Sequence, residues 1–445
     1  MRLPRPRTLT RATLAGALVA TLTGLGVTAQ ADQVTPGNFT GYAFDQCLTP
    51  TQKSMDTWME HSPFSAVGIY ISGDSRACRN QPNLTPTWVS KQLANGWRLL
   101  PITLGPQANC LDRFPRYSDD KVIKKSSANN YAKAQKQARK EAKKAVAAAQ
   151  ALGIDAGSTL WYDLEGFDLK NTVCRDSAMW FLHGWTTQIH ALGYVSGVYS
   201  SAGSGIKMLD DARVKTPGKY ALPDRLWVAR WDGNANLEAP GYLRSDGWMP
   251  HARVKQYRGG HNETWGGVTI NIDSNYLSLG KGTTAKAEKP KCKEKVTVSL
   301  PSYPKLKPGT TNVAAARALQ CLLRKQKVYS GPINGALDQK TLTAANAFRT
   351  RNNLAPKKAF NRAGWVTLLA QGAKTPVLKH GSKGAPVRRL QRALTAANQQ
   401  SVPASGVFDA RTEAAVKQWQ RKVKVPASGV VNTATWRLLL AGRLK

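Results

Sequence analysis

The chain has 445 residues, which is too long for one typical domain and predicts two or three. Lys and Arg number 64 against 27 Asp and Glu, giving a formal net charge of +37. No apolar run long enough to cross a bilayer follows the N-terminal segment, which excludes membrane insertion of the mature chain.

The N-terminus predicts a secretory signal peptide over residues 1–31. A basic segment with Arg2, Arg5, Arg7 and Arg11 precedes an apolar stretch from Ala12 to about Val27 and the small-residue site Ala29-Gln30-Ala31. No two arginines of this N-terminal segment are adjacent, which favours the general secretion route over the twin-arginine route. A retained membrane anchor is the alternative. We therefore expect a secreted protein that is extracellular or associated with the cell wall.

Export makes the six cysteines candidates for disulfides. Cys292 and Cys321 are expected to pair with each other, whereas Cys47, Cys78, Cys110 and Cys174 allow three pairings among which the sequence does not choose. No C-x-x-C, H-x-H or H-E-x-x-H pattern occurs. We expect neither a metal site nor a cofactor.

Eight short strands, mostly separated by segments of helix length, are predicted between residues 38 and 280. The strands are Thr40–Asp45, Ala66–Ser72, Arg98–Leu104, Leu160–Glu165, Tyr194–Ser200, Arg225–Trp231, Ala252–Tyr257 and Val268–Asp273. The helices are Pro50–His61, Thr85–Ala94, Ser127–Leu152 and Asp176–Leu192. This alternation fits an α/β fold, a parallel (β/α)8 TIM-like barrel.

Carboxylates stand where several of these strands end. Asp163 and Glu165 are two residues apart, so on a strand they point to the same face. Two acids at the end of a buried strand are costly unless they have a task, and paired carboxylates suit glycosidic bond cleavage. An ordinary salt-bridged strand end is the alternative. Because barrel active sites lie at the C-terminal ends of the strands, Asp45, Asp232 and Asp273 join the candidate site.

A Lys-rich linker over 281–305 leads to two repeats, predicted as all-α modules of three helices over 306–372 and 378–442. The repeats match at an offset of 71 residues through Leu319/Leu390, Gly335/Gly406, Asp338/Asp409, Thr341/Thr412, Phe348/Trp419 and Trp365/Trp436. Their aromatics are expected to be core residues rather than ligand platforms. Residues 281–445 hold 32 basic against five acidic residues, a net charge of +27, whereas residues 32–280 hold 28 against 22. Such a field attracts polyanions, and a secreted protein meets acidic cell-wall polymers before nucleic acid.

The stretch Asn38–Leu279 resembles the glycoside-hydrolase-like barrel domain of secreted bacterial proteins, which is related to the family 25 lysozymes. The resemblance rests on Gly41-Tyr42-Ala43-Phe44-Asp45, Trp161-Tyr162-Asp163-Leu164-Glu165, Gly197-Val198-Tyr199-Ser200, Gln256-Tyr257 and Ile272-Asp273. It implies that Glu165 is the proton donor, and that Asp163 supports the oxocarbenium-like transition state or orients the acetamido group of the substrate. Asp45 and Asp273 would tune the acid and hold the sugar.

The same resemblance places substrate-binding side chains around these acids, namely Tyr70, Tyr199, Trp231, Asp232 and Gln256. Sugars stack on aromatic faces and form hydrogen bonds with amides. Clustered carboxylates cannot all ionise cheaply, so one of the four catalytic candidates should keep its proton near neutral pH.

The two C-terminal repeats resemble the three-helix peptidoglycan-binding module, which implies peptidoglycan as a partner. The second copy matches better, through Gly406-Val407-Phe408-Asp409 and Ala415-Val416-Lys417-Gln418-Trp419-Gln420, so binding is expected chiefly there.

The sequence thus predicts a monomeric, muramidase-like hydrolase of cell-wall glycan that is tethered to its substrate. The rival is a wall-binding protein whose barrel no longer catalyses, because Phe44-Asp45-Gln46-Cys47 departs from the lysozyme pattern. A wall peptidase or amidase would need a zinc site or a nucleophilic triad. The sequence shows neither H-x-H nor G-x-S-x-G.

Overall fold

The computed structural model describes residues 34–445, so the predicted signal peptide lies outside the described residues. Within that range, no helix combines the length and the apolar character that crossing a membrane requires.

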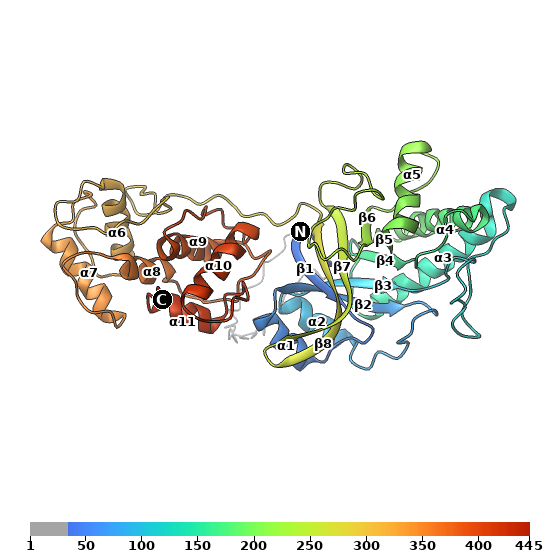
Figure 1. Cartoon of the computed structure of the whole chain (residues 1–445), viewed down its shortest axis with the longest axis horizontal. Coiled ribbons are helices and arrows are strands. Elements are labelled where there is room, and N and C mark those ends of the chain that lie inside the picture. The colour runs from blue at the N-terminus through green and yellow to red at the C-terminus, as the bar shows by residue number, and fades with distance from the viewer. Residues whose placement is uncertain (1–33) are drawn as a thin grey trace, which may run out of the picture. The chain divides into compact units, whose positions relative to one another are not determined.

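Eight strands close into a barrel in chain order, each hydrogen-bonded to the next (Figure 1). They are β1 (Phe39–Asp45), β2 (Phe64–Ser72), β3 (Arg98–Thr103), β4 (Thr159–Asp163), β5 (Val195–Ser201), β6 (Arg225–Ala229), β7 (Ala252–Trp265) and β8 (Val268–Leu279). The predicted eight-stranded α/β barrel is confirmed.

Helical segments follow each of the first five strands and cover the outside of the barrel (Figure 1). They are α1 (Gln52–His61), α2 (Pro86–Ala94), α3 (Ala128–Ala151), α4 (Thr172–Ala191), the π-helical turn η1 (Ala202–Ile206) and α5 (Lys207–Lys215). Helix α4 begins at Thr172 and not at Asp176, because the Asn171 side chain accepts a hydrogen bond from the Cys174 N–H and caps the helix there.

The prediction that all eight strands are parallel is wrong, because β8 is antiparallel to both β7 and β1. Gly266 and Gly267 form a two-residue turn with positive φ at both positions, 59° and 80°. Turns of this kind match the twist of a tight hairpin and reverse the chain. No crossover helix therefore lies between β7 and β8, and residues 230–251 before β7 form turns.

The hairpin also makes the last two strands longer than predicted. Strand β7 continues past Tyr257 to Trp265, and β8 continues past Asp273 to Leu279. Asp273 consequently lies within β8, where it pairs in register with Asp45 at the end of β1. The reversal of β8 brings Asp273 to the same end of the barrel as the C-termini of the parallel strands.

Strand β4 shows how the period of two sorts side chains between the inside and the outside of the barrel. Trp161 belongs to the core inside the barrel and meets Trp227 of β6 edge to face, with ring centroids 5.5 Å apart. Tyr162 points outward, where its ring lies 5.0 Å from Phe181 and 4.9 Å from Trp185 of α4. Asp163 shares the inner face with Trp161.

Three disulfides join all six cysteines, and the predicted Cys292–Cys321 pair is confirmed. Of the three pairings left open for the other four, the structure has Cys47–Cys78 and Cys110–Cys174.

The C-terminal region is helical, as predicted, and each repeat supplies three helices (Figure 1). They are α6 (Val313–Lys325), α7 (Gln339–Arg351) and α8 (Arg362–Ala370), then α9 (Ala385–Asn398), α10 (Ala410–Lys422) and α11 (Thr433–Leu440). In the first repeat, the buried Gln320 accepts from the Gly335 N–H and donates to Thr341. Gln391 does the same with Gly406 and Thr412 in the second. The conserved spacing of the repeats therefore maintains one buried hydrogen-bond network.

The aromatics shared by the two repeats are core residues, as expected. Phe348, Trp419 and Trp365 are fully buried, and Trp436 is 1% exposed. The indole N–H of Trp365 donates to the Pro304 carbonyl, and that of Trp436 donates to Pro376. None of these four rings is open to a ligand.

Candidate active site

Four acids predicted from the sequence come from three strands to the same end of the barrel. Asp45 ends β1, Asp163 ends β4, Glu165 follows two residues later, and Asp273 faces Asp45 from β8. A cavity of about 300 Å³ opens beside them and is lined by Asp45, Glu165 and Asp273, together with Tyr70 from β2. Asp163 is 3% exposed and is not part of the cavity lining.

Gln256 on β7 connects the two sides of this cluster. Its amide NH2 donates to Asp273 Oδ2 at 3.1 Å and to Asp45 Oδ1 at 3.3 Å. Its carbonyl oxygen accepts from the Tyr199 hydroxyl at 3.0 Å and from the Trp231 indole N–H at 2.9 Å. Two donors on the oxygen orient the amide, so its NH2 group is directed at the two carboxylates.

Asp45 is almost fully buried and has carboxylate neighbours. Burial and the nearby charge of Asp273 raise its pKa to about 8, although hydrogen bonds from Asn275 and Gln256 oppose the shift. The Asn275 contact is short, with Nδ2 2.6 Å from Oδ1, and Asn275 is itself oriented by the Trp227 indole at 2.7 Å. Near neutral pH, Asp45 is therefore able to hold a proton.

Asp163 is the most enclosed of the four. Its Oδ2 accepts from the Tyr70 hydroxyl at 3.4 Å, while Oδ1 is buried without a hydrogen-bond partner among residues 34–445. Burial, followed by the charges of Glu165 and Asp45, raises the pKa of Asp163 well above its ordinary value. Burial also raises the pKa of Asp273, while a hydrogen bond from the Gly260 N–H opposes this. The sequence predicts one protonated acid, whereas the structure raises the pKa of three, Asp45, Asp163 and Asp273.

Glu165 is in a different environment. Its carboxylate forms an ion pair with Arg113, with Oε2 2.7 Å from the guanidinium nitrogen, and its side chain is 26% exposed. Its backbone N–H donates to Gln107 Oε1, and the Gln107 amide donates to the Asp163 carbonyl, which fixes the backbone between the two acids. An arginine at this distance stabilises a carboxylate in its charged form.

The predicted substrate-binding residues divide into two groups. Tyr70, Tyr199 and Gln256 belong to the cluster, and burial raises the pKa of both tyrosines well above the ordinary value. Trp231 is 67% exposed, with its N–H on Gln256, so its ring faces solvent beside the acids. Asp232 is engaged elsewhere, by Lys255 at 2.8 Å and Arg230 at 3.1 Å. Within residues 34–445 it makes no hydrogen bond or ion pair with the four acids.

Sequence reasoning missed three residues of the site. Asn275 lies two positions after Asp273 on the same face of β8, so the period of two could have found it. Gln107 and Arg113 lie in the irregular segment between β3 and α3. No local pattern there indicates which side chains turn toward the acids.

Two family models match the chain. The model described as Rv2525c-like, glycoside hydrolase-like domain matches residues 56–277. Asp163, Glu165, Gln256 and Asp273 lie inside this range, and Asp45 precedes it. A model for a peptidoglycan binding domain matches residues 383–439, which is the second repeat. No curated protein matches the chain.

Solved structures with a similar chain path include the Tat-secreted protein Rv2525c from Mycobacterium tuberculosis in complex with L-tartrate. It is 14% identical, with a TM-score of 0.36 over 55% of this chain and 98% of that one. An uncharacterized protein from B. stearothermophilus is 17% identical, with a TM-score of 0.34 over 53% and 95%. The modular autolysin LytC from Streptococcus pneumoniae is 14% identical, with a TM-score of 0.32 over 53% and 46%.

The barrel match ends at residue 277 and the second match begins at residue 383, so the two concern separate parts of the chain. The chain thus joins a barrel that matches the model for an Rv2525c-like, glycoside hydrolase-like domain to a C-terminal repeat that matches the model for a peptidoglycan binding domain.

Proposed function

We propose that the protein is a secreted, monomeric hydrolase that cleaves a cell-wall glycan of the peptidoglycan type. The observation that carries this proposal is the set of carboxylates beside one open cavity, some with raised pKa and one ion-paired. Glycosidic cleavage needs an acid that protonates the leaving oxygen and a carboxylate that stabilises or attacks the sugar. Neighbouring acids in different environments have different pKa values, so one is able to donate the proton while another is charged.

In this proposal Glu165 donates the proton. It lines the cavity, whereas Asp163 is not part of the lining and has a pKa raised by burial. Arg113 is 54% exposed, so an entering sugar is able to displace it from Glu165. Of these two acids, Glu165 is the one within reach of a substrate in the cavity, so the proton passes to the leaving oxygen from Glu165.

The remaining groups of the site hold the sugar and the developing charge. Asp45 and Asp273 share the amide of Gln256, so a change of protonation at one is felt by the other. The exposed ring of Trp231 offers a stacking face, and its N–H contact with Gln256 fixes that ring beside the acids.

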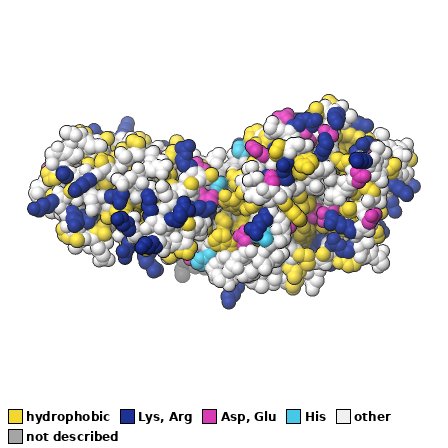
Figure 2. Space-filling model, viewed as in Figure 1, with side chains coloured by type: hydrophobic (Ala, Val, Ile, Leu, Met, Phe, Trp, Pro, Cys, Tyr) yellow, Lys and Arg dark blue, Asp and Glu magenta, His cyan; other side chains and the backbone are white. Residues whose placement is uncertain are grey.

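We infer that the second repeat tethers the barrel to the wall. A groove of about 500 Å³ on this repeat is lined by Arg411, Gln418 and Arg421, among others. Figure 2 shows Lys and Arg side chains over much of the visible face of the C-terminal helices, where Asp and Glu are few. A field of this sign attracts anionic wall polymers, and tethering raises the local concentration of substrate.

Replacing Arg411 and Arg421 together by Ala is expected to weaken sedimentation with purified wall about tenfold, because two exposed cations are lost from the groove. The matched control is Lys340→Ala with Arg351→Ala, which removes two exposed cations from the equivalent helix of the first repeat. Co-sedimentation over a range of protein concentrations measures the affinity. An equal loss in the control would show that general charge, and not the groove, binds the wall.

The experiment that tests the proposed activity is digestion of purified peptidoglycan, with products identified by mass spectrometry and reducing-end analysis. New muramic acid reducing ends are expected. The rival function, a wall-binding protein with an inactive barrel, predicts none at acidic or neutral pH while the protein still sediments with the wall.

A further inference from the structure

The cavity beside the acids has a cationic wall that cleavage of a neutral sugar does not require. Its lining includes Arg76 and Arg116 in addition to Asp45, Glu165 and Asp273. Neither arginine forms an ion pair with any carboxylate of residues 34–445, in contrast to Arg113 on Glu165. The cavity is therefore lined both by acids and by two arginines that form no ion pair within the described residues.

Arg76 is half-buried and held in place by neutral groups. Its Nε donates to the Gly73 carbonyl at 2.9 Å, and one terminal nitrogen donates to the Tyr70 carbonyl at 3.0 Å. Burial lowers its pKa, yet an arginine stays charged at physiological pH. A partly desolvated guanidinium that is oriented by carbonyls and forms no ion pair is prepared to receive an anion.

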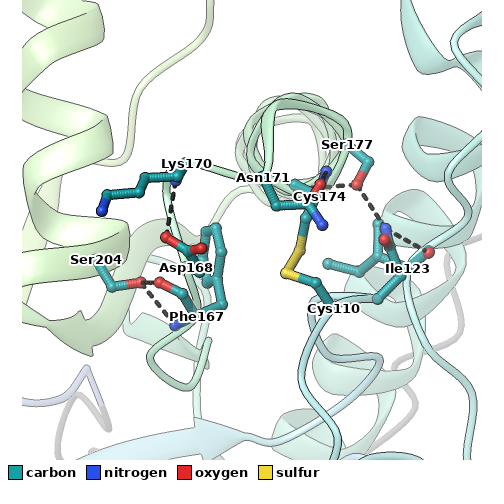
Figure 3. The surroundings of a disulfide bond; sticks show 10 residues. Cys110, Ile123, Phe167, Asp168, Lys170, Asn171, Cys174, Ser177 and Ser204 are labelled. Atoms are coloured by element: carbon teal, nitrogen blue, oxygen red, sulfur yellow. Dashed lines mark hydrogen bonds between the residues drawn. A yellow bond between two sulfur atoms is a disulfide. The ribbon is translucent and has the colours of Figure 1, made fainter.

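Arg116 comes from the segment between β3 and α3, and that segment is anchored on both sides. Figure 3 shows the Cys110–Cys174 disulfide joining it to the start of α4, where Asn109 also donates to Ser177 at 2.8 Å. Nearer the cavity, the Arg116 backbone N–H donates to Asp120 at 2.8 Å.

The Arg116 guanidinium lies over the Phe114 ring, 5.0 Å from its centroid. Its nitrogens make no hydrogen bond with other residues in the described chain. The segment is thus fixed, whereas the charged end of Arg116 has no polar partner.

We propose that the cavity takes a sugar that carries a carboxylate, with the ring toward the acids and the carboxylate on Arg76 and Arg116. This inference rests on the proposed function and narrows its substrate class. The planar fork of a guanidinium matches a carboxylate with two parallel hydrogen bonds. An anionic sugar is repelled by the acids and attracted by the arginines, so only one orientation is favourable.

N-acetylmuramic acid and N-acetylglucosamine are matched probes, because they differ only in the lactyl ether that bears the carboxylate. In intact peptidoglycan that carboxylate is amide-bonded to the stem peptide. A free one belongs to muramic acid residues whose peptides have been removed, so the expected cleavage sites in purified peptidoglycan are those from which an amide-cleaving reaction has removed the peptide.

The test is a titration of the full mature chain with each sugar, in which binding is measured by calorimetry or by NMR. N-acetylmuramic acid should bind at least about tenfold more tightly than N-acetylglucosamine, the equivalent of one charge-assisted hydrogen bond. Arg116→Gln should remove that preference and leave N-acetylglucosamine binding unchanged. Arg116→Lys should restore part of it. Arg139→Gln on α3, outside the cavity lining, is the matched control and should bind like the parent.

Equal affinity for the two sugars, or a preference that survives Arg116→Gln, would overturn the inference. Tighter binding of N-acetylglucosamine 6-phosphate than of N-acetylmuramic acid would overturn it as well, and would assign the cationic wall to phosphate. Because binding is measured without turnover, a protein that shows the preference and never cleaves glycan would refute only the proposed activity.

Discussion

Replacing Glu165 by Gln is expected to lower the rate of glycan cleavage by about 10²- to 10⁴-fold, the usual contribution of a positioned general acid. Gln keeps the size of the side chain but cannot deliver a proton to the leaving oxygen. The side chain lies in the open cavity, and its backbone N–H bond to Gln107 does not involve the carboxylate. The fold and wall binding should therefore be unaffected.

Release of reducing ends from purified peptidoglycan, compared at equal concentrations of folded protein, measures this effect. Glu238→Gln is a matched control, because Glu238 is exposed, lies in the segment between β6 and β7 and does not line the cavity. A Glu165→Gln protein that cleaves as fast as the parent would exclude Glu165 as the proton donor. Loss of wall sedimentation together with activity would indicate damage to the fold instead.

The second large effect is expected from Asp163→Asn, which should make the barrel more stable at pH 8 and leave its stability nearly unchanged at pH 4. The pKa of Asp163 is raised in the folded state, chiefly by burial. At pH values above the pKa that Asp163 has in the unfolded chain, the folded protein therefore binds more protons than the unfolded chain does. The contribution of Asp163 to stability is fully present below its pKa in the unfolded chain. It is lost as the pH rises through its pKa in the folded protein.

Asparagine is neutral at every pH, so the variant lacks the penalty of burying a charge at Asp163. Each unit by which the folded pKa is raised corresponds to about 1.4 kcal/mol at high pH, so a gain of more than about 1 kcal/mol is expected. Asn is able to accept from Tyr70 in place of Oδ2. Its NH2 group would occupy the position of Oδ1, which has no hydrogen-bond partner among the described residues.

Scanning calorimetry of the barrel transition at the two pH values measures the difference, again with Glu238→Gln as the control. The parent should also lose stability between about pH 4 and pH 8, because the pKa of Asp45 is raised to about 8 in the same cluster. A variant that is less stable than the parent at pH 8 would show that Asp163 is charged and satisfied in the folded protein.

The local features of the chain were predictable because neighbouring residues decide them. The period of two puts Trp161 and Asp163 on one face of β4, and the offset of 71 residues predicts two equivalent helical modules. The structure shows the same buried hydrogen bonds in both modules. The Gly266-Gly267 turn was also a local signal, and it should have predicted the antiparallel hairpin that the structure shows.

The sequence by itself determined which carboxylates are candidates, which aromatics form cores and that a helical region follows the barrel. Only the tertiary structure decided the direction of β8, the pairing of four cysteines and the partners of each acid. Gln256 and Asn275 donate hydrogen bonds to Asp45, although they are 211 and 230 residues away from it in the sequence. Arg113 approaches Glu165 from a segment without periodicity. Protonation depends on burial and on charges within a few ångströms, and both exist only after closure of the barrel has brought distant strands together.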